Sequence, residues 1–227
     1  MRVLVALGGS ALLERGEPAD ALAQQSNVEA AAVALAALAE EHELVVTHEN
    51  SPCGMVGFLL ELALRNALPD RDLVTVLSEV VVSPGDRAFE APFKPISPEP
   101  QAIVAMRSLR TLIDAGVLVI CAGGGIPVTL NGDGTMRGIE AVVDNDLTAS
   151  LLARRLDADL FVMLTAGDAV RLDWDGGDER ALGAGPKVEA AGRFVEATGR
   201  RAAIGGLTRA VEIVRGEAGT QILAPGA

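Results

Sequence analysis

Glycine-rich segments that follow two apolar runs could hold an anion. They are Gly8, Gly9 and Ser10 after the run 3–7, and Gly123, Gly124 and Gly125 after the run 117–121. Glycine lets backbone N–H groups approach a ligand closely, and three consecutive glycines lose conformational entropy without packing a side chain. At the carboxyl ends of parallel strands, such loops predict a pocket for a phosphate-bearing or similar small anion. The alternatives are an ordinary tight turn for the first segment and a structural loop for the second.

A lysine stands out among the basic residues. Two of the 19 basic residues are lysines, Lys94 and Lys187, so arginine serves wherever this chain needs a generic positive charge. Lys187 follows Gly185 and Pro186 at the start of a predicted helix, where the helix dipole disfavours a cation unless a negative group faces it. The choice of a compact ammonium there predicts a functional role.

Polar residues at two further predicted strand and helix ends complete the set of candidates. Asp144 and Asp146 open a predicted helix over 146–156, where carboxylates suit the helix dipole and would cap the first turn. The functional alternative is that Asp144 orients a lysine or a metal-bound phosphate. Thr165 and Asp168 lie at the end of a predicted strand over 160–165, where they would contact a nucleotide or form a simple turn.

Elements of alternating type must position these residues. Apolar runs of strand length alternate with stretches of helical period, which is typical of βαβ units and a mostly parallel sheet. The core is aliphatic, because aromatic residues make up 3% of the chain, and 227 residues suit one domain. The predicted strands are 3–7, 44–47, 73–82, 117–121, 160–165, 202–204 and 221–223. The predicted helices are 26–40 (opened by a capping box at Ser26), 55–68, 103–115, 146–156, 188–197 and 207–215, with a proline-rich loop over 83–100 and a hairpin turn at 131–134.

Composition excludes several classes of partner. A formal net charge of -12 repels nucleic acid and anionic membrane surfaces, so neither is expected to bind. Cys53 and Cys121 are far apart in sequence and lack nearby histidines, so neither a zinc site nor a disulfide framework is predicted. The N-terminal apolar run suits a first strand better than a signal peptide, and no run reaches transmembrane length, so we expect a cytoplasmic protein.

The chain resembles the carbamate kinases of the amino acid kinase superfamily along nearly its whole length. The matching segments, in order, are VALGGSALLERGE, VVTHEN, GGGIPV, GIEAVVDND, ADLFVMLT, GPKVEAAGRFVEATG and GTQI. The resemblance implies a three-layer αβα sandwich with a mainly parallel central sheet, usually dimeric. It also implies a single domain over 1–227, with an acceptor half over about 1–130 and a nucleotide half over about 131–227. The implied reaction interconverts ATP and carbamate, or a related small acid, with ADP and carbamoyl phosphate.

Roles for the candidate residues follow from the same resemblance. It places Gly8, Gly9 and Ser10 around the transferred phosphate and gives Asp144 the orientation of the catalytic cations. The acceptor side comprises His48, Asn50, Gly123, Gly124 and Gly125. The nucleotide side comprises Thr165, Asp168, Gly185, Pro186 and Lys187, and MgATP or MgADP enters as substrate, with no tightly bound protein metal expected. Positioning and charge stabilisation are the main requirements of phosphoryl transfer, in agreement with these residue types.

Departures from the family pattern leave an alternative function open. Asn145 stands where the family has a lysine, and Ser10 stands where it has an asparagine. VVTHEN leads almost at once into SPCGMVGF, and KPI joins SPEP where the family inserts a protruding subdomain that covers the site, so this lid is expected to be missing. Loss of a cation at a transferring phosphoryl group costs on the order of a hundredfold or more. The alternative is a homologue that binds nucleotide or another small ligand without turnover.

Overall fold

The computed structural model describes residues 1–12, 21–48, 53–90, 97–121, 125–167 and 184–226. Among these residues, the main sheet has seven strands in the order β11-β10-β9-β1-β2-β6-β3. All neighbours pair in parallel except β10 and β11. The strands are β1 (Arg2–Leu7), β2 (Glu43–His48), β3 (Leu73–Val76), β6 (Leu118–Cys121), β9 (Leu160–Thr165), β10 (Ala202–Gly206) and β11 (Thr220–Ile222).

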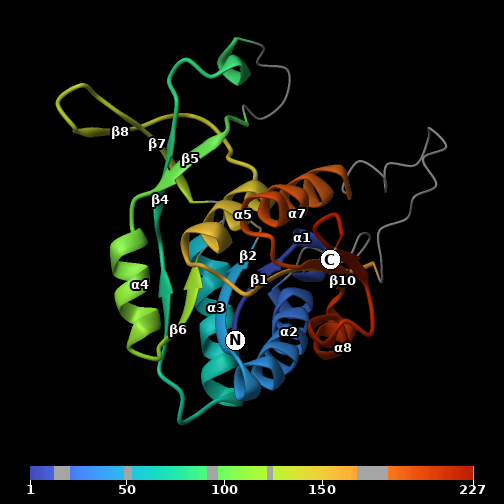
Figure 1. Cartoon of the computed structure of the whole chain (residues 1–227). Helices are drawn as coiled ribbons and strands as arrows, with labels where there is room; N and C mark the ends of the chain where they lie inside the picture. Colours follow the sequence, from blue (N-terminus) through green and yellow to red (C-terminus); the bar gives the residue numbers. More distant parts are fainter. Residues whose placement is uncertain (13–20, 49–52, 91–96, 122–124, 168–183, 227) are drawn as a thin grey trace.

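Helices cover both faces of this sheet, as Figure 1 shows. Alternate residues of β1 enter two separate hydrophobic clusters, with Val3 and Val5 on one face and Leu4 and Ala6 on the other. The first face packs against α2 (Ala21–Glu41), α3 (Cys53–Ala67) and α8 (Ala210–Arg215), and the short helix α1 (Gly9–Leu12) lies on the same side. The second packs against α4 (Met106–Asp114), α5 (Asn145–Arg155) and α7 (Ala184–Thr198). The predicted three-layer αβα sandwich with a mainly parallel sheet is confirmed.

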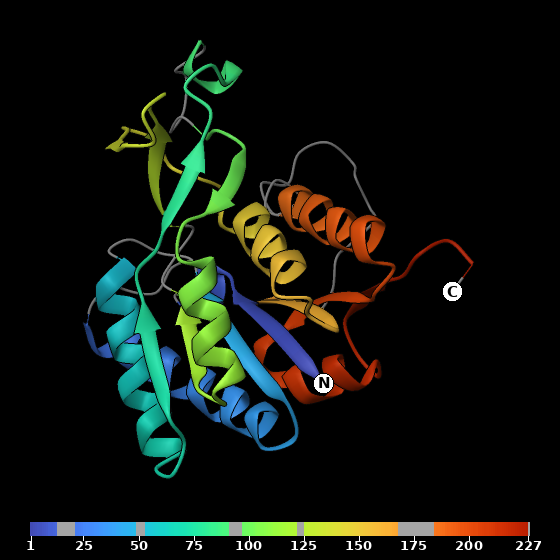
Figure 2. The ribbon, with the colours of Figure 1, turned by 60° about the vertical axis from the view of Figure 1, so that its left-hand side comes forward.

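A second sheet projects from the end of the molecule opposite the N-terminus (Figure 2). Its order among the described residues is β5-β4-β7-β8, with β4 and β7 parallel and the outer pairs antiparallel. Its strands are β4 (Glu79–Val82), β5 (Pro100–Ile103), β7 (Ile126–Leu130) and β8 (Met136–Gly138). The segment between β4 and β5 carries the 3₁₀ turn η1 (Arg87–Phe89), where the Asp86 carboxylate accepts hydrogen bonds from the N–H groups of Ala88 and Glu99.

Three element predictions are wrong in informative ways. The apolar run 73–82 is not one strand, because β3 ends at Val76 and β4 joins the second sheet. The helix predicted over 103–115 begins at Met106, since Ile103 pairs with Val80 as part of β5. Helix α2 begins at Ala21 rather than at Ser26, so the capping-box pattern lies inside an alanine-rich helix whose propensity carries it further.

The exposed edge of the main sheet is covered by two charged side chains of α3. Glu61 accepts a hydrogen bond of 2.7 Å from the N–H of Thr75 on the edge strand β3, and Arg65 donates one of 2.7 Å to the carbonyl of Leu73. The two side chains also bond to each other at 2.8 Å. Burial alone would raise the pKa of Glu61, but the hydrogen bonds from Arg65 and Thr75 outweigh it and hold the pKa below 4.5. Backbone groups that would otherwise pair with another chain are therefore satisfied internally.

We expect Glu61→Gln to lower stability in a pH-dependent way. The pKa of Glu61 is lower in the folded protein than in the unfolded chain. Its contribution is therefore complete above about pH 4.5 and is lost as the pH falls through the folded pKa. Urea unfolding at pH 7 should show a loss of about 1 kcal/mol, typical of one intramolecular hydrogen bond. The difference from the unsubstituted protein should shrink steadily between pH 5 and pH 3, and a loss that stays constant over this range would contradict the assignment.

Candidate functional site

The glycine loop after β1 lies against the end of β9. Gly8 donates its N–H to the carbonyl of Leu164 at 2.8 Å, and α1 begins at Gly9. The hydroxyl oxygens of Ser10 and Thr165 lie 2.9 Å apart, and the N–H of Ala166 donates to the Ser10 hydroxyl at 3.4 Å. The predicted phosphate-binding segment and the predicted nucleotide-binding Thr165 therefore form one cluster at the carboxyl ends of neighbouring parallel strands.

Lys187 is the fourth residue of α7, and its buried side chain is paired with a carboxylate. Its Nζ lies 2.8 Å from each carboxylate oxygen of Asp146, and the two side chains are 11% and 12% exposed. The negative group that the helix dipole requires opposite this lysine is present, as predicted. Breaking such a pair by removing one partner is strongly destabilising, because the other charge is left buried without compensation.

The Lys187 ammonium also lies beside the glycine loop. A Cβ atom placed on Gly8 would come within 3.4 Å of Lys187 Nζ and 3.2 Å of the Leu164 carbonyl oxygen. A side chain at Gly8 would therefore crowd the Leu164 carbonyl oxygen and contact the ammonium, and glycine lets the backbone and the ammonium lie close together. Gly8, Ser10, Thr165 and Lys187, predicted separately from sequence, are brought together.

Helix N-termini add positive potential at this place. Helices α5 and α7 begin on either side of the Lys187–Asp146 contact and pack against each other, as Figure 1 shows. The first turn of each helix carries the positive end of its dipole. Together with Lys187, the two helices could stabilise a phosphate group in a protein whose overall charge is negative.

Asp144 caps helix α5, which is one of the two alternatives predicted for it from sequence. It is the N-cap of α5, with φ −64° and ψ 124°, and its carboxylate accepts the N–H of Leu147 at 2.9 Å. The carboxylate that pairs with Lys187 is Asp146, which sequence reasoning had assigned to capping alone. The available signal was the unfavourable position of Lys187, which demanded a partner without identifying it. A direct catalytic role for Asp144 stays a prediction.

The acceptor-side residues are placed in part. His48 is buried at the end of β2, opposite Leu7 in the register of β1 and β2, and so next to the glycine loop. Gly125 has φ +82°, and a Cβ there would lie 2.2 Å from Val80 Cγ2 and 3.1 Å from the Ser78 carbonyl oxygen, so packing between β4 and β7 already requires glycine. Asn50, Gly123, Gly124 and Asp168 lie outside the described residues.

The remaining candidates are the Cys121 thiol, the residues before Lys187, a metal site and a membrane span. Burial raises the pKa of the Cys121 thiol to about 12, so it does not provide a thiolate near neutral pH. Gly185 is exposed and Pro186 half-buried in the first turn of α7. Among the described residues, no group of three or more His, Cys, Asp or Glu side chains could hold a metal ion, and no helix is long and apolar enough to cross a membrane.

Comparison with known proteins agrees with this geometry. The model of the amino acid kinase family matches residues 1–192. A carbamate kinase of Rhizobium meliloti is 36% identical over 98% of this chain and 93% of its own length, and one of Haemophilus influenzae is 34% identical over 98% and 96%. The solved structure of the Giardia lamblia carbamate kinase bound to AMP-PNP superposes with a TM-score of 0.89 at 31% identity, covering 98% of both chains.

The length of these alignments shows that the chain is shorter than its relatives. The Rhizobium meliloti alignment runs over 301 positions, whereas this chain has 227 residues. Segments present in the relative are therefore absent here, although both ends are matched. The expected shortening of the chain is confirmed.

Proposed function

Because the chain belongs to the amino acid kinase family and matches carbamate kinases along almost their entire length, we propose that it is a carbamate kinase-like phosphotransferase. The proposed reaction moves a phosphoryl group between ATP and carbamate or a related small acid. The observation that carries the proposal is the meeting of Lys187, Asp146, Gly8 and Ser10 at the strand ends of a chain so similar to those enzymes. We place the acceptor in the half over about 1–130 and the nucleotide in the half over about 131–227.

Each residue of the cluster around Lys187 has a distinct part in this proposal. Lys187 places its ammonium beside the transferred phosphoryl group, and Asp146 holds that ammonium in position. The Ser10 hydroxyl offers a hydrogen bond to a phosphate oxygen, and the absence of a side chain at Gly8 leaves room for the phosphate beside Lys187. In the direction of ATP synthesis, a β-phosphate oxygen of ADP attacks the phosphorus of carbamoyl phosphate, the P–O bond to the carbamoyl oxygen breaks, and carbamate leaves.

Mg²⁺ fits this arrangement as an ion delivered with the nucleotide phosphates. Such an ion commonly relies on one or two carboxylates together with the phosphates. Asp144, whose carboxylate is not committed to Lys187, is the described residue we assign to that ion. When bound, Mg²⁺ would neutralise charge that develops on the phosphates. This assistance matters here because Asn145 stands where the family has a lysine. A homodimer in the cytoplasm remains the expected setting.

The proposal is tested by ATP synthesis. Purified protein is mixed with carbamoyl phosphate and MgADP, and ATP formation is followed by luminescence, with acetyl phosphate as the comparison donor. ATP formed from carbamoyl phosphate supports the carbamate reaction, and ATP formed from acetyl phosphate instead points to a related carboxyl acceptor. Binding of MgADP without ATP from either donor would contradict the proposal and favour a homologue that binds ligand without turnover.

A further inference from the structure

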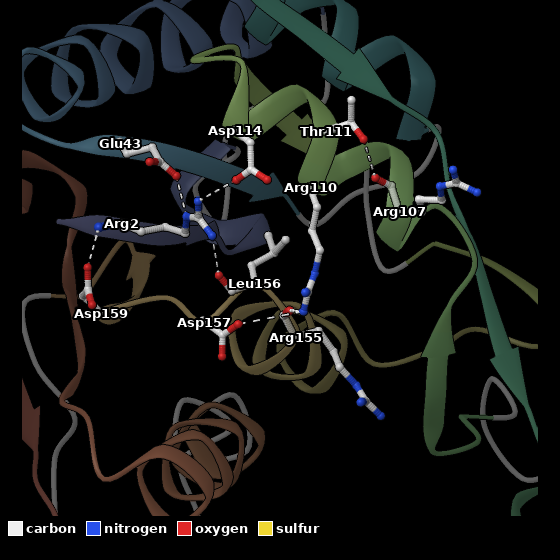
Figure 3. Close-up of polar contacts among 10 residues, drawn as sticks. All are labelled: Arg2, Glu43, Arg107, Arg110, Thr111, Asp114, Arg155, Leu156, Asp157 and Asp159. Carbon is white, nitrogen blue, oxygen red and sulfur yellow. Dashed lines mark hydrogen bonds and ion pairs between the residues drawn. The ribbon is translucent and has the colours of Figure 1, made fainter.

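A groove of about 500 Å³ lies at the opposite end of α5 from Asp146. Its sides carry three arginines, Arg107 and Arg110 from α4 and Arg155 from the last turn of α5 (Figure 3). Its apolar part is formed by Ile103 and Met106. Arg155 follows Asp146 by nine positions of α5, a helical length of about 14 Å between the groove and the Lys187–Asp146 contact.

One of the three arginines has a structural role. The guanidinium of Arg110 donates a hydrogen bond to the carbonyl of Arg155 and lies 3.9 Å from the Asp157 carboxylate. Arginine is favourable there, because the carbonyls at the end of a helix lack partners and carry the negative end of the dipole. Stabilisation of the end of α5 therefore accounts for Arg110.

The other two arginines have no such partner. Within the described residues, the guanidinium groups of Arg107 and Arg155 make neither a hydrogen bond nor an ion pair, although the backbone carbonyl of each accepts one. Two unpaired cations on the walls of one groove produce a local positive field in an otherwise negative protein.

The acidic residue of the groove does not cancel this charge. Asp114 lies 3.4 Å from the guanidinium of Arg2, which also bonds to Glu43 and to the carbonyl of Leu156 (Figure 3). Arg2 thus compensates Asp114 on the side away from Arg107.

We propose that this groove binds a small organic polyanion, with one phosphate or carboxylate group at Arg107, a second at Arg155 and its apolar body against Ile103 and Met106. Guanidinium groups suit this ligand class because their planar N–H forks bind oxyanions in a bidentate manner. The site goes beyond the proposed reaction, because it shares no residue with the cluster around Lys187.

The test reads the groove directly. Pyrophosphate and citrate are titrated separately into the protein at low ionic strength, and the side-chain Nε–Hε NMR signals of Arg107 and Arg155 are followed. Orthophosphate, which has a single phosphate group, is the comparison. We expect both signals to move with either or both polyanions at concentrations at least tenfold below those at which orthophosphate moves them. Which of the two probes binds distinguishes a phosphate ligand from a carboxylate ligand. Failure of both probes to move the signals would overturn the proposal.

Matched variants separate the site from the general charge of the surface. At the Arg155 signal, Arg107→Ala should weaken polyanion binding by about tenfold, and Arg107→Lys, which keeps the charge without the fork, by less. Arg209→Ala removes the same charge from an exposed residue paired with Glu212 at 4.0 Å and should leave the affinity unchanged. Equal weakening in Arg107→Ala and Arg209→Ala would also overturn the proposal. Arg110 is kept in every variant because it stabilises the end of α5.

Discussion

Lys187→Met is expected to reduce kcat/KM for ATP synthesis from carbamoyl phosphate and MgADP by at least about a hundredfold. The ammonium lies beside the Gly8 loop, and loss of one fixed positive group or hydrogen-bond donor at a developing charge costs about 10² to 10³ in rate. The change should also destabilise the fold by about 3 kcal/mol or more, because Asp146 is left buried and charged without a partner. Luminescent ATP detection and urea unfolding measure the two effects.

A double variant distinguishes lost catalysis from lost stability. Lys187→Met combined with Asp146→Asn removes both charges of the buried pair, so it should recover much of the stability that the single change costs. It should not recover ATP synthesis, because no ammonium faces the phosphate. If the double variant regains activity along with stability, Lys187 has a structural role alone.

The sequence was most informative where a structural feature depends on residues that are close together in the chain. The core strands were predicted because short runs of aliphatic residues must be buried, and Lys187 was singled out because its type and position were both unusual for this chain. Each of these signals lies within a few residues. The cluster of Gly8, Ser10, Thr165 and Lys187 followed because parallel strands bring their carboxyl ends to one edge of a sheet.

The failures arose where long-range packing decides. The run 73–82 reads as one strand because apolar periodicity does not show that the chain passes from one sheet to another at Leu77 and Ser78. The sequence reading gave the orientation of a lysine to Asp144 and capping alone to Asp146, because both carboxylates suit the start of a helix and the local pattern does not decide the pairing with Lys187. The pairing depends on the rotation of α5 against α7, which no local pattern specifies.

Asp146→Asn should lower kcat about 10- to 100-fold while leaving the affinity for MgADP within a few-fold of its original value. Asp146 positions the ammonium through two 2.8 Å contacts, and a neutral amide would hold it less firmly while keeping the same shape. The matched comparison is Asp144→Asn, since asparagine is also a good N-cap and should preserve α5. Measured by initial rates and calorimetry, a loss of kcat in Asp146→Asn that saturating Mg²⁺ does not relieve, beside a raised Mg²⁺ requirement in Asp144→Asn, would assign the orientation of Lys187 to Asp146 and the ion to Asp144. A loss confined to Asp144→Asn would instead support the catalytic role predicted for that residue from sequence and would leave Asp146 as a partner that serves folding alone.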